Sequence, residues 1–310
     1  MNKIINKILA SLILVVISIL FVGCKKKPED KIKVLLPQGT PLVAIGNLLD
    51  NEMFDFNIVN GQDPLMEAFI KGEYDLIIAP LNLGTKLYIA QKSEYKLKAI
   101  ITTNNTYLAS KTKLENIEEV NGKKILAFGE GSTPGLALNS VMNYKNLTPE
   151  KVEYRSSASD VTLEYTSNNT EYDYFLLAEP NISIIANKTK KEVYTISLAD
   201  LLADEVEMLI QACLFVNPNK EIKSEVINKI ESNIKEMNNN PQSYAKEIET
   251  KHNFFEGLTK EVLEKAIPNC NITYINAKDN QSIIENYYKL LDKFQPSVLQ
   301  GKRPNESFFI

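Results

Sequence analysis

The stretch that decides the fold is Tyr-Asp-Leu-Ile-Ile-Ala-Pro, residues 74–80. Its apolar centre, closed by Pro80, is typical of a strand that is buried on both faces of a sheet. A second stretch is Tyr-Asp-Tyr-Phe-Leu-Leu-Ala-Glu-Pro, residues 172–180. It also begins with Tyr-Asp and ends with Ala and Pro, with Glu179 inserted between them. This near-repeat predicts two lobes of similar construction.

Similar apolar runs alternate with helix-like segments along the chain. Further strands are predicted at residues 33–38, 56–59, 97–103, 125–128, 152–155 and 209–216, and helices at 64–70, 222–237 and 258–266. Buried strands that alternate with helices are typical of α/β proteins. We therefore predict an α/β fold of two lobes, each a mixed, mainly parallel sheet flanked by helices, with a ligand cleft between the lobes.

The order of these elements predicts which parts of the chain build each lobe. Residues 32–109 and 204–310 are expected to form lobe 1, and residues 110–203 to form lobe 2. The strand-like run at 209–216 would return the chain to lobe 1, and the residues from 201 onward are otherwise expected to be mostly helical. The chain must then cross between lobes twice, near Ser110 and near Ala203.

The N-terminal residues have the pattern of an export signal. Lys3 and Lys7 precede an apolar run at residues 8–22, which is marginal for a bilayer span of about 20 residues. The run ends in Phe21-Val22-Gly23-Cys24, which resembles a bacterial lipobox. We predict a signal peptide at residues 1–23, lipidation of Cys24 and a tether at 24–31. The protein would be exported and lipid-anchored to a bacterial membrane, at the cell surface or in the periplasm. The alternative is an uncleaved anchor helix.

Composition favours binding over chemistry. The net charge of −4 argues against a nucleic-acid partner, and one His with two Arg leaves little equipment for acid–base catalysis. Three Cys exclude a disulfide-stapled scaffold and a Cys-rich metal cluster. We predict no catalytic residue, no cofactor and no metal site. Cys213 and Cys270 have apolar neighbours and are expected to be buried free thiols, with a disulfide between them as the alternative.

Loops that follow predicted strands supply the candidate ligand site. In open parallel sheets the ligand binds beyond the carboxyl ends of the strands. That rule nominates these residues for ligand binding: Gln38, Thr40, Asn60, Pro80, Asn82, Asn104, Tyr107, Ser132, Thr133, Ser157 and Glu179. Residues 131–134 are the most specific, with Ser132 or Thr133 as helix N-cap and Pro134 as the first helical residue. Each loop alone is compatible with an ordinary cap or turn, and it is their convergence that favours a site.

The arrangement resembles a type II solute-binding protein of an ABC importer, in the branch that includes nitrate, sulfonate, taurine and thiamine-precursor receptors. The resemblance rests on residues 21–24, 74–80, 115–128, 131–134, 173–180, 294–296 and 301–309. It implies that two lobes close around one small molecule and that the closed protein, a monomer, delivers this solute to a membrane permease.

Residue usage also bears on the ligand. An oxyanion would favour arginine, and the two in this chain are Arg155, expected at the surface, and Arg303. Glu130 and Glu179 lie in cleft loops, and Tyr107 could stack on a ring. We expect a small neutral or cationic heterocycle rather than an oxyanion.

Two other classes of function stay open on the sequence. The first is a membrane-anchored sensor or adhesin with no role in transport. The second is an enzyme similar to the thiamine-precursor synthases, whose site is equipped with His and Cys. We find no such pair here, because neither Cys213 nor Cys270 lies in a cleft loop.

Overall fold

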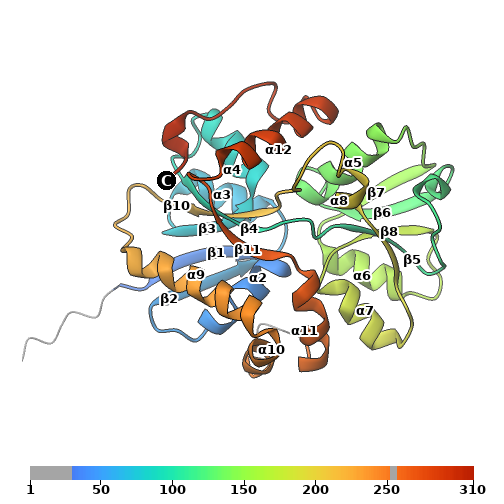
Figure 1. Cartoon of the computed structure of the whole chain (residues 1–310), viewed down its shortest axis with the longest axis horizontal. Coiled ribbons are helices and arrows are strands. Elements are labelled where there is room, and N and C mark those ends of the chain that lie inside the picture. Colours follow the sequence, from blue (N-terminus) through green and yellow to red (C-terminus); the bar gives the residue numbers. More distant parts are fainter. Residues whose placement is uncertain (1–29, 252–256) are drawn as a thin grey trace, which may run out of the picture. The chain divides into compact units, whose positions relative to one another are not determined.

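The computed structural model describes residues 30–251 and 257–310, and residues 32–310 form one compact unit (Figure 1). The predicted signal peptide, Cys24 and most of the tether lie outside the described residues. Within the described ranges, no helix combines the length and the apolar character needed to cross a bilayer.

Lobe 1 contains a six-stranded sheet in the order β11-β4-β10-β3-β1-β2. Its strands are β1 (Ile32–Pro37), β2 (Phe54–Val59), β3 (Leu76–Pro80), β4 (Lys96–Thr102), β10 (Ala212–Val216) and β11 (Ile272–Asn276). β1 runs parallel to both β2 and β3, whereas β10 is antiparallel to β3 and β4. Cys213 on β10 pairs in register with Ala79, so the chain returns next to the stretch that decides the fold.

Helices cover both faces of this sheet. One face packs on α2 (Thr40–Ala44), α9 (Ser224–Asn239), α10 (Pro241–Glu249) and α11 (Lys260–Ala266), and the other on α3 (Asp63–Lys71), α4 (Leu81–Ile89) and α12 (Gln281–Phe294). In Figure 1, α4 and α12 lie above the sheet, and α9 and α10 lie below it. Short 3₁₀ turns complete the lobe at η1 (Gly46–Leu48), η3 (Ile267–Asn269) and η4 (Glu306–Phe308).

Lobe 2 contains a five-stranded sheet in the order β7-β6-β8-β5-β9. Its strands are β5 (Tyr107–Ser110), β6 (Lys124–Phe128), β7 (Lys151–Arg155), β8 (Tyr174–Leu177) and β9 (Tyr194–Ser197). α6 (Ala158–Thr166) and α7 (Asn181–Thr189) cover one face, α5 (Thr133–Tyr144) and α8 (Leu198–Leu201) pack on the other, and η2 (Ile117–Val120) precedes β6. β6 is parallel to β7 and β8, and β5 is antiparallel to β8 and β9.

The two-lobed α/β fold predicted from the sequence is confirmed, and the sheets are mixed as expected. Three strands were not predicted, namely β5, β9 and β11. β5 and β9 have four residues each, too few for a clear alternation of apolar and polar side chains. β11 lies at a sheet edge within the region expected to be mostly helical, and four of its five residues are only partly buried.

Two chain segments connect the lobes, and they lie side by side. Thr103 forms an isolated antiparallel bridge with Ile210, and Asn104 donates its backbone N–H to the Leu209 carbonyl oxygen at 2.9 Å. β5 pairs within the second sheet, so the first crossing lies at residues 103–106, before the expected boundary at 109/110. The second lies near residue 209, after the expected boundary at 203/204. The first difference arises because β5 pairs within the sheet of lobe 2.

Candidate functional site

The strand-end loops of the two lobes face each other. Thr40, Gly61, Gln62 and Asn82 follow β1, β2 and β3 of lobe 1, whereas Gly131, Ser156 and Glu179 follow β6, β7 and β8 of lobe 2. We call these seven residues the inter-lobe zone. It joins the carboxyl ends of three parallel strands from each lobe. In open α/β sheets, ligands bind at these ends.

Two hydrogen bonds and two close approaches at glycines define the inter-lobe zone. The Thr40 hydroxyl donates to the Glu179 carbonyl oxygen at 2.6 Å, and Asn82 Nδ2 donates to the Gly131 carbonyl oxygen at 2.9 Å. A methyl group placed on Gly61 would lie 3.9 Å from the Ser156 carbonyl oxygen, and one on Gly131 would lie 3.3 Å from Gln62 Oε1. Each strand-end loop of lobe 1 therefore has a close neighbour in lobe 2.

Asn105 ties the Thr40–Glu179 contact to the crossing. Its Nδ2 donates to Thr40 Oγ1 at 2.7 Å and to the Glu179 carbonyl oxygen at 3.1 Å, and its Oδ1 accepts from the Glu179 N–H at 2.8 Å. Gln211, on the returning segment, holds the backbone of Asn105 through two further hydrogen bonds, from the Asn105 N–H and to its carbonyl oxygen. The strand ends of both lobes and both crossing segments thus form one buried network.

The Glu179 carboxyl group is buried beside this network. Its two oxygens accept hydrogen bonds at 3.0 Å from the N–H and the hydroxyl of Ser183, in the first turn of α7. Burial raises the pKa of Glu179 to about 7, and the Ser183 donors offset only part of this effect. Burial and the nearby Glu179 carboxyl also raise the pKa values of Tyr107 and Cys270. The site thus holds a carboxyl group that titrates near neutrality.

Asn82 is the most deeply buried amide of the inter-lobe zone, with 3% of its surface exposed. It is the second residue of α4, directly beyond the carboxyl end of β3. Its Nδ2 reaches Gly131 in the other lobe, whereas its Oδ1 is buried and has no hydrogen-bond partner. A buried acceptor without a donor is costly and is rare in folded proteins.

The loop before α5 is built on close backbone contacts. Ser132 is the N-cap residue, and its hydroxyl donates to the Gly129 carbonyl oxygen at 3.2 Å instead of capping the helix. Thr133, almost fully buried, accepts a 3.4 Å hydrogen bond from Tyr287 on α12 of lobe 1. A Cβ atom on Gly135 would lie 2.4 Å from the Gly129 carbonyl oxygen, so only glycine fits there. The prediction of Ser132 as N-cap is confirmed, and Pro134 occupies the second helical position.

The other predicted site residues occupy several environments. Pro80 ends β3 and precedes Asn82, whereas Gln38 and Asn60 are exposed at the ends of β1 and β2. Ser157 caps α6 through a reciprocal pair of hydrogen bonds with Asp160. These positions place Asn82, Thr40 and Glu179 in direct inter-lobe contacts, and leave Gln38, Asn60 and Ser157 without a hydrogen bond to the other lobe among the described residues.

Asn104 and Tyr107 lie at the crossing. Asn104 has a left-handed backbone, with φ of 49°, and its Oδ1 accepts from the Leu209 N–H at 2.7 Å. Asparagine tolerates this conformation better than most residues. The Tyr107 hydroxyl donates to the Asn269 carbonyl oxygen of lobe 1 at 3.5 Å. The expected role of Tyr107 in stacking on a ligand ring stays a prediction.

Sequence reasoning missed Asn105, Gln62, Ser183 and Gln211. Asn105 follows Asn104 directly after a predicted strand, which is a local signal for a polar strand end. The other three lie within or near helices and strands, where a lone polar residue predicts nothing specific. Ser183 contacts Glu179 within lobe 2, whereas Gln62 and Gln211 gain their neighbours only when distant parts of the chain meet.

Both arginines are engaged with carboxylates outside the inter-lobe zone. Arg155 lies on β7, partly exposed as expected, and forms an ion pair with Glu153 while its guanidinium contacts the Tyr172 hydroxyl. Arg303 forms ion pairs with Glu285 at 2.8 Å and with Asp292 at 2.6 Å. Arg155 is the last residue of β7, next to Ser156 of the inter-lobe zone, but its guanidinium is engaged with Glu153 and Tyr172.

Cys213 and Cys270 are buried free thiols, which confirms the prediction made from their apolar neighbours. Cys213 lies on β10 within the core, and burial raises its pKa well above the usual value. Across residues 30–251 and 257–310, no group of three or more His, Cys, Asp or Glu side chains is placed to hold a metal ion.

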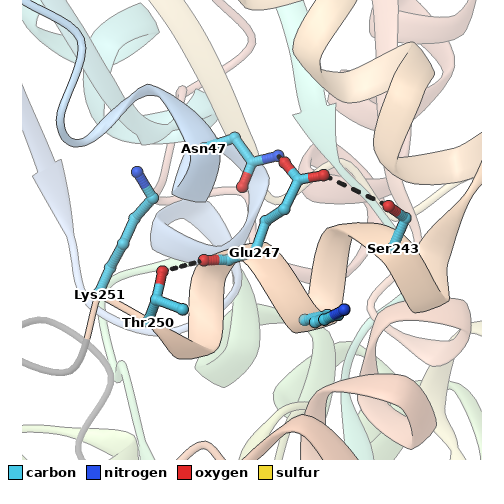
Figure 2. Close-up of a pocket in the computed structure, with 6 residues that line it drawn as sticks. Asn47, Ser243, Glu247, Thr250 and Lys251 are labelled. Carbon is cyan, nitrogen blue, oxygen red and sulfur yellow. Dashed lines mark hydrogen bonds between the residues drawn. The ribbon is translucent and has the colours of Figure 1, made fainter.

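A separate groove of about 490 Å³ lies on lobe 1, between η1 and α10 (Figure 2). Its lining residues are Asn47, Ser243, Lys246, Glu247, Thr250 and Lys251. Glu247 occupies its centre, where its carboxylate accepts from Asn47 Nδ2 at 2.6 Å and from the Ser243 hydroxyl at 3.3 Å. All of these residues come from lobe 1, so the groove is distinct from the inter-lobe zone.

Comparison with protein-family profiles and with curated proteins found no match. Solved structures do match. An ABC transporter protein from Parabacteroides distasonis has a TM-score of 0.73 and 22% identity, over 91% of this chain and 99% of that one. The alkanesulfonate-binding protein of Xanthomonas axonopodis pv. citri, solved bound to MOPS, has a TM-score of 0.65 and 13% identity, over 91% and 97%.

A protein from Candida albicans, described as exhibiting the generic periplasmic binding protein fold, has a TM-score of 0.58 and 12% identity, over 90% of this chain and 94% of that one. At these identities the similarity concerns the fold. The chain therefore has the two-lobed periplasmic-binding-protein fold, as predicted from its sequence.

Proposed function

We propose that this protein is an extracytoplasmic solute-binding protein that captures a small molecule between its two lobes and delivers it to an ABC-importer permease. The observation that carries the proposal is the inter-lobe zone, where strand ends of both lobes meet through Thr40–Glu179 and Asn82–Gly131. A solute held there would contact both lobes at once, so its binding would favour the closed arrangement.

Similarity of fold supports this proposal. The matched structures from Parabacteroides distasonis and Xanthomonas axonopodis are an ABC transporter protein and an alkanesulfonate-binding protein. Fold alone does not determine function. The polar side chains that this chain places between its lobes are therefore the specific support for solute binding.

We infer that the solute is a small neutral or cationic heterocycle rather than an oxyanion. Arg155 and Arg303 are both paired with carboxylates away from the inter-lobe zone. The zone instead contains the buried carboxyl group of Glu179. A carboxylate there would repel a sulfonate and attract a ring N–H or an amine.

A thermal-shift screen tests the proposal. Residues 25–310 include the whole compact unit and omit the predicted signal peptide and Cys24. The panel contains aminopyrimidines, nicotinamide, taurine and methanesulfonate. A ligand present at about 100 times its Kd adds ~2.7 kcal/mol of stability, which gives a clear upward shift in Tm.

Two variants test whether the solute binds in the inter-lobe zone. Thr40→Val removes the hydroxyl that contacts Glu179 and is expected to weaken the shift, whereas Asn47→Ala in the groove of Figure 2 is expected to leave it unchanged. Methanesulfonate binding without any heterocycle would contradict the proposed ligand class. Failure of every compound to bind the unsubstituted protein would contradict the small-solute function and favour a surface partner.

The proposed anchor is tested separately. Expressed as the full chain in a bacterium with lipoprotein processing, the protein is expected in the membrane fraction with a diacylglyceryl group on Cys24. Cys24→Ser is expected to abolish the modification seen by mass spectrometry. An unmodified Cys24 in a membrane-bound chain that keeps residues 1–23 would favour the uncleaved anchor helix.

A further inference from the structure

The unpartnered Oδ1 of Asn82 identifies the hydrogen-bonding character of the solute. Of the described side chains with a buried unpartnered oxygen, Asn82 is the one in the inter-lobe zone, the others being Asn47, Tyr274 and Asp292. The Oδ1 and Nδ2 atoms of Asn82 are bonded to the same carbon. The free acceptor therefore lies in the same contact between lobes that its Nδ2 makes with Gly131.

The orientation of this amide is set by its partner. The Gly131 carbonyl oxygen accepts a 2.9 Å hydrogen bond, so it must face the NH₂ group of Asn82. The opposite orientation would place two carbonyl oxygens against each other and would lose the hydrogen bond to Gly131. The unsatisfied atom is thus an acceptor, and a group that satisfies it must be a donor.

We propose that Asn82 Oδ1 accepts a hydrogen bond from an N–H or O–H group of the captured solute while Asn82 Nδ2 holds Gly131 of lobe 2. The inference rests on the proposed function and narrows it, because the solute must carry a donor. One side chain then recognises the ligand and joins the lobes, so a solute without this donor leaves a buried acceptor unsatisfied in the closed protein.

The size of this preference follows from the burial of Asn82. An unsatisfied buried acceptor costs about 1–3 kcal/mol, which corresponds to roughly 5-fold to 150-fold in affinity. A binding site that hydrogen-bonds a ligand donor discriminates strongly against the analogue that lacks it, because the polar group of the site is left unpaired. Asn82 thus predicts selectivity between ligands of nearly the same shape.

Two matched pairs of compounds test the inference. Aminopyrimidine is compared with dimethylaminopyrimidine, and nicotinamide with N,N-dimethylnicotinamide, because methylation removes the N–H donors and keeps the ring. Isothermal titration of the unsubstituted protein is expected to show tighter binding of the donor-bearing member of a pair by about 10-fold. Asn82→Leu is expected to bring that ratio to about one, since leucine has no acceptor.

Asn82→Asp is the matched control, because it keeps an acceptor at the Oδ1 position and replaces the donor to Gly131 with a charged oxygen that repels the Gly131 carbonyl oxygen. It is expected to retain the preference for the donor-bearing compound while weakening both affinities. Circular dichroism of each variant establishes that it is folded, and Asn82→Ala, which also lacks an acceptor, replaces Asn82→Leu should the latter fail to fold.

The outcomes distinguish the proposed role of Asn82 from the proposed solute-binding function. If the unsubstituted protein binds one pair and Asn82→Leu keeps the full preference for the donor, the role of Asn82 is wrong and the solute-binding function stands. Equal binding of both members to the unsubstituted protein has the same meaning. If no compound of either pair binds the unsubstituted protein, the result counts against both the inference and the heterocycle-binding function.

Discussion

At the scale of single residues, Glu179 has separate roles for its backbone and for its carboxyl group. Its backbone joins lobe 2 to Thr40 and Asn105, and its carboxyl group contacts Ser183. Glu179 lies in a turn directly after β8, and its bond to Pro180 is cis. Glu179 stands between the Ala and the Pro that end the second stretch, where the first stretch has no residue, and it is Glu179 that contacts the other lobe.

We predict that Glu179 makes stability fall as the pH rises. Its pKa is raised from 4.5 to about 7 in the folded protein, so between these values the unfolded chain releases a proton that the folded chain retains. The contribution of Glu179 to stability is therefore largest below pH 4.5 and declines up to about pH 7, by about 3 kcal/mol at most. Urea unfolding across this range measures the effect, and Glu179→Gln is expected to remove this part of the decline.

Ser183→Ala is expected to change the pH dependence of stability in the opposite sense to Glu179→Gln. It removes one donor to the Glu179 carboxylate and is expected to extend the decline to higher pH. A pH profile that is the same in the unsubstituted protein and in Glu179→Gln would contradict the raised pKa.

A second residue-scale prediction concerns Gly135. A Cβ atom there would meet the backbone of residues 129 and 130 at 2.4–2.9 Å, and this backbone has no room to move without displacing the loop. Gly135→Ala is expected to cost about 1–3 kcal/mol in thermal or urea unfolding. Gly131→Ala is the control, because its Cβ would meet only the end of the Gln62 side chain at 3.3 Å. Equal losses in the two variants would contradict this account.

At the scale of elements, the loops that follow the strands determine which helix residues face the other lobe. α4 begins directly after β3 and α5 follows β6 after a short loop, and the first turns of both helices contact the other lobe. α6 begins after β7 in the same way, but its N-cap residue Ser157 is engaged with Asp160 of its own first turn. Strand–helix order alone therefore nominates more residues than the inter-lobe contacts use.

Substitution of Ser157 separates capping from ligand binding. Ser157→Ala is expected to lower stability by about 1 kcal/mol, because it removes the acceptor for the Asp160 N–H. Ser157→Thr keeps the hydroxyl and is expected to remain within a few tenths of a kcal/mol of the unsubstituted protein. Thermal unfolding measures both. If Ser157→Ala also weakens solute binding in a titration, the predicted ligand role of Ser157 is supported beside its role as a cap.

At the scale of the whole molecule, Asn105 connects the two crossing segments to the strand ends of both lobes. We predict that Asn105→Ala weakens the contact between lobes, because it removes three hydrogen bonds and leaves the Glu179 N–H unpaired. Small-angle X-ray scattering is expected to show a larger radius of gyration in the absence of solute, with a loss of about 1–3 kcal/mol in stability.

Asn217 is the control for Asn105, since its side chain makes a similar set of three hydrogen bonds within lobe 1, with Gly72, Tyr74 and Asn219. Asn217→Ala is expected to lose stability without a change in radius of gyration. An unchanged radius in Asn105→Ala would show that the connection between lobes depends on other contacts.

The sequence by itself determined the α/β class, the two lobes and the positions of the main strands. Continuous apolar runs such as residues 74–80 can be satisfied only inside a sheet covered on both faces, so this information is local and readable. The same holds for Ser132 at the start of α5 and for the buried thiols Cys213 and Cys270, which are surrounded by apolar neighbours in the chain itself.

The tertiary structure alone decided which of the nominated residues meet. Asn82 with Gly131, and Thr40 with Glu179, are distant in sequence, and no local pattern encodes their pairing. Short strands such as β5 form because a neighbouring strand supplies their hydrogen bonds, which moved the crossing to residues 103–106. Local patterns record burial, whereas a contact between two lobes depends on how the completed sheets are placed, and that placement is a property of the whole packed chain.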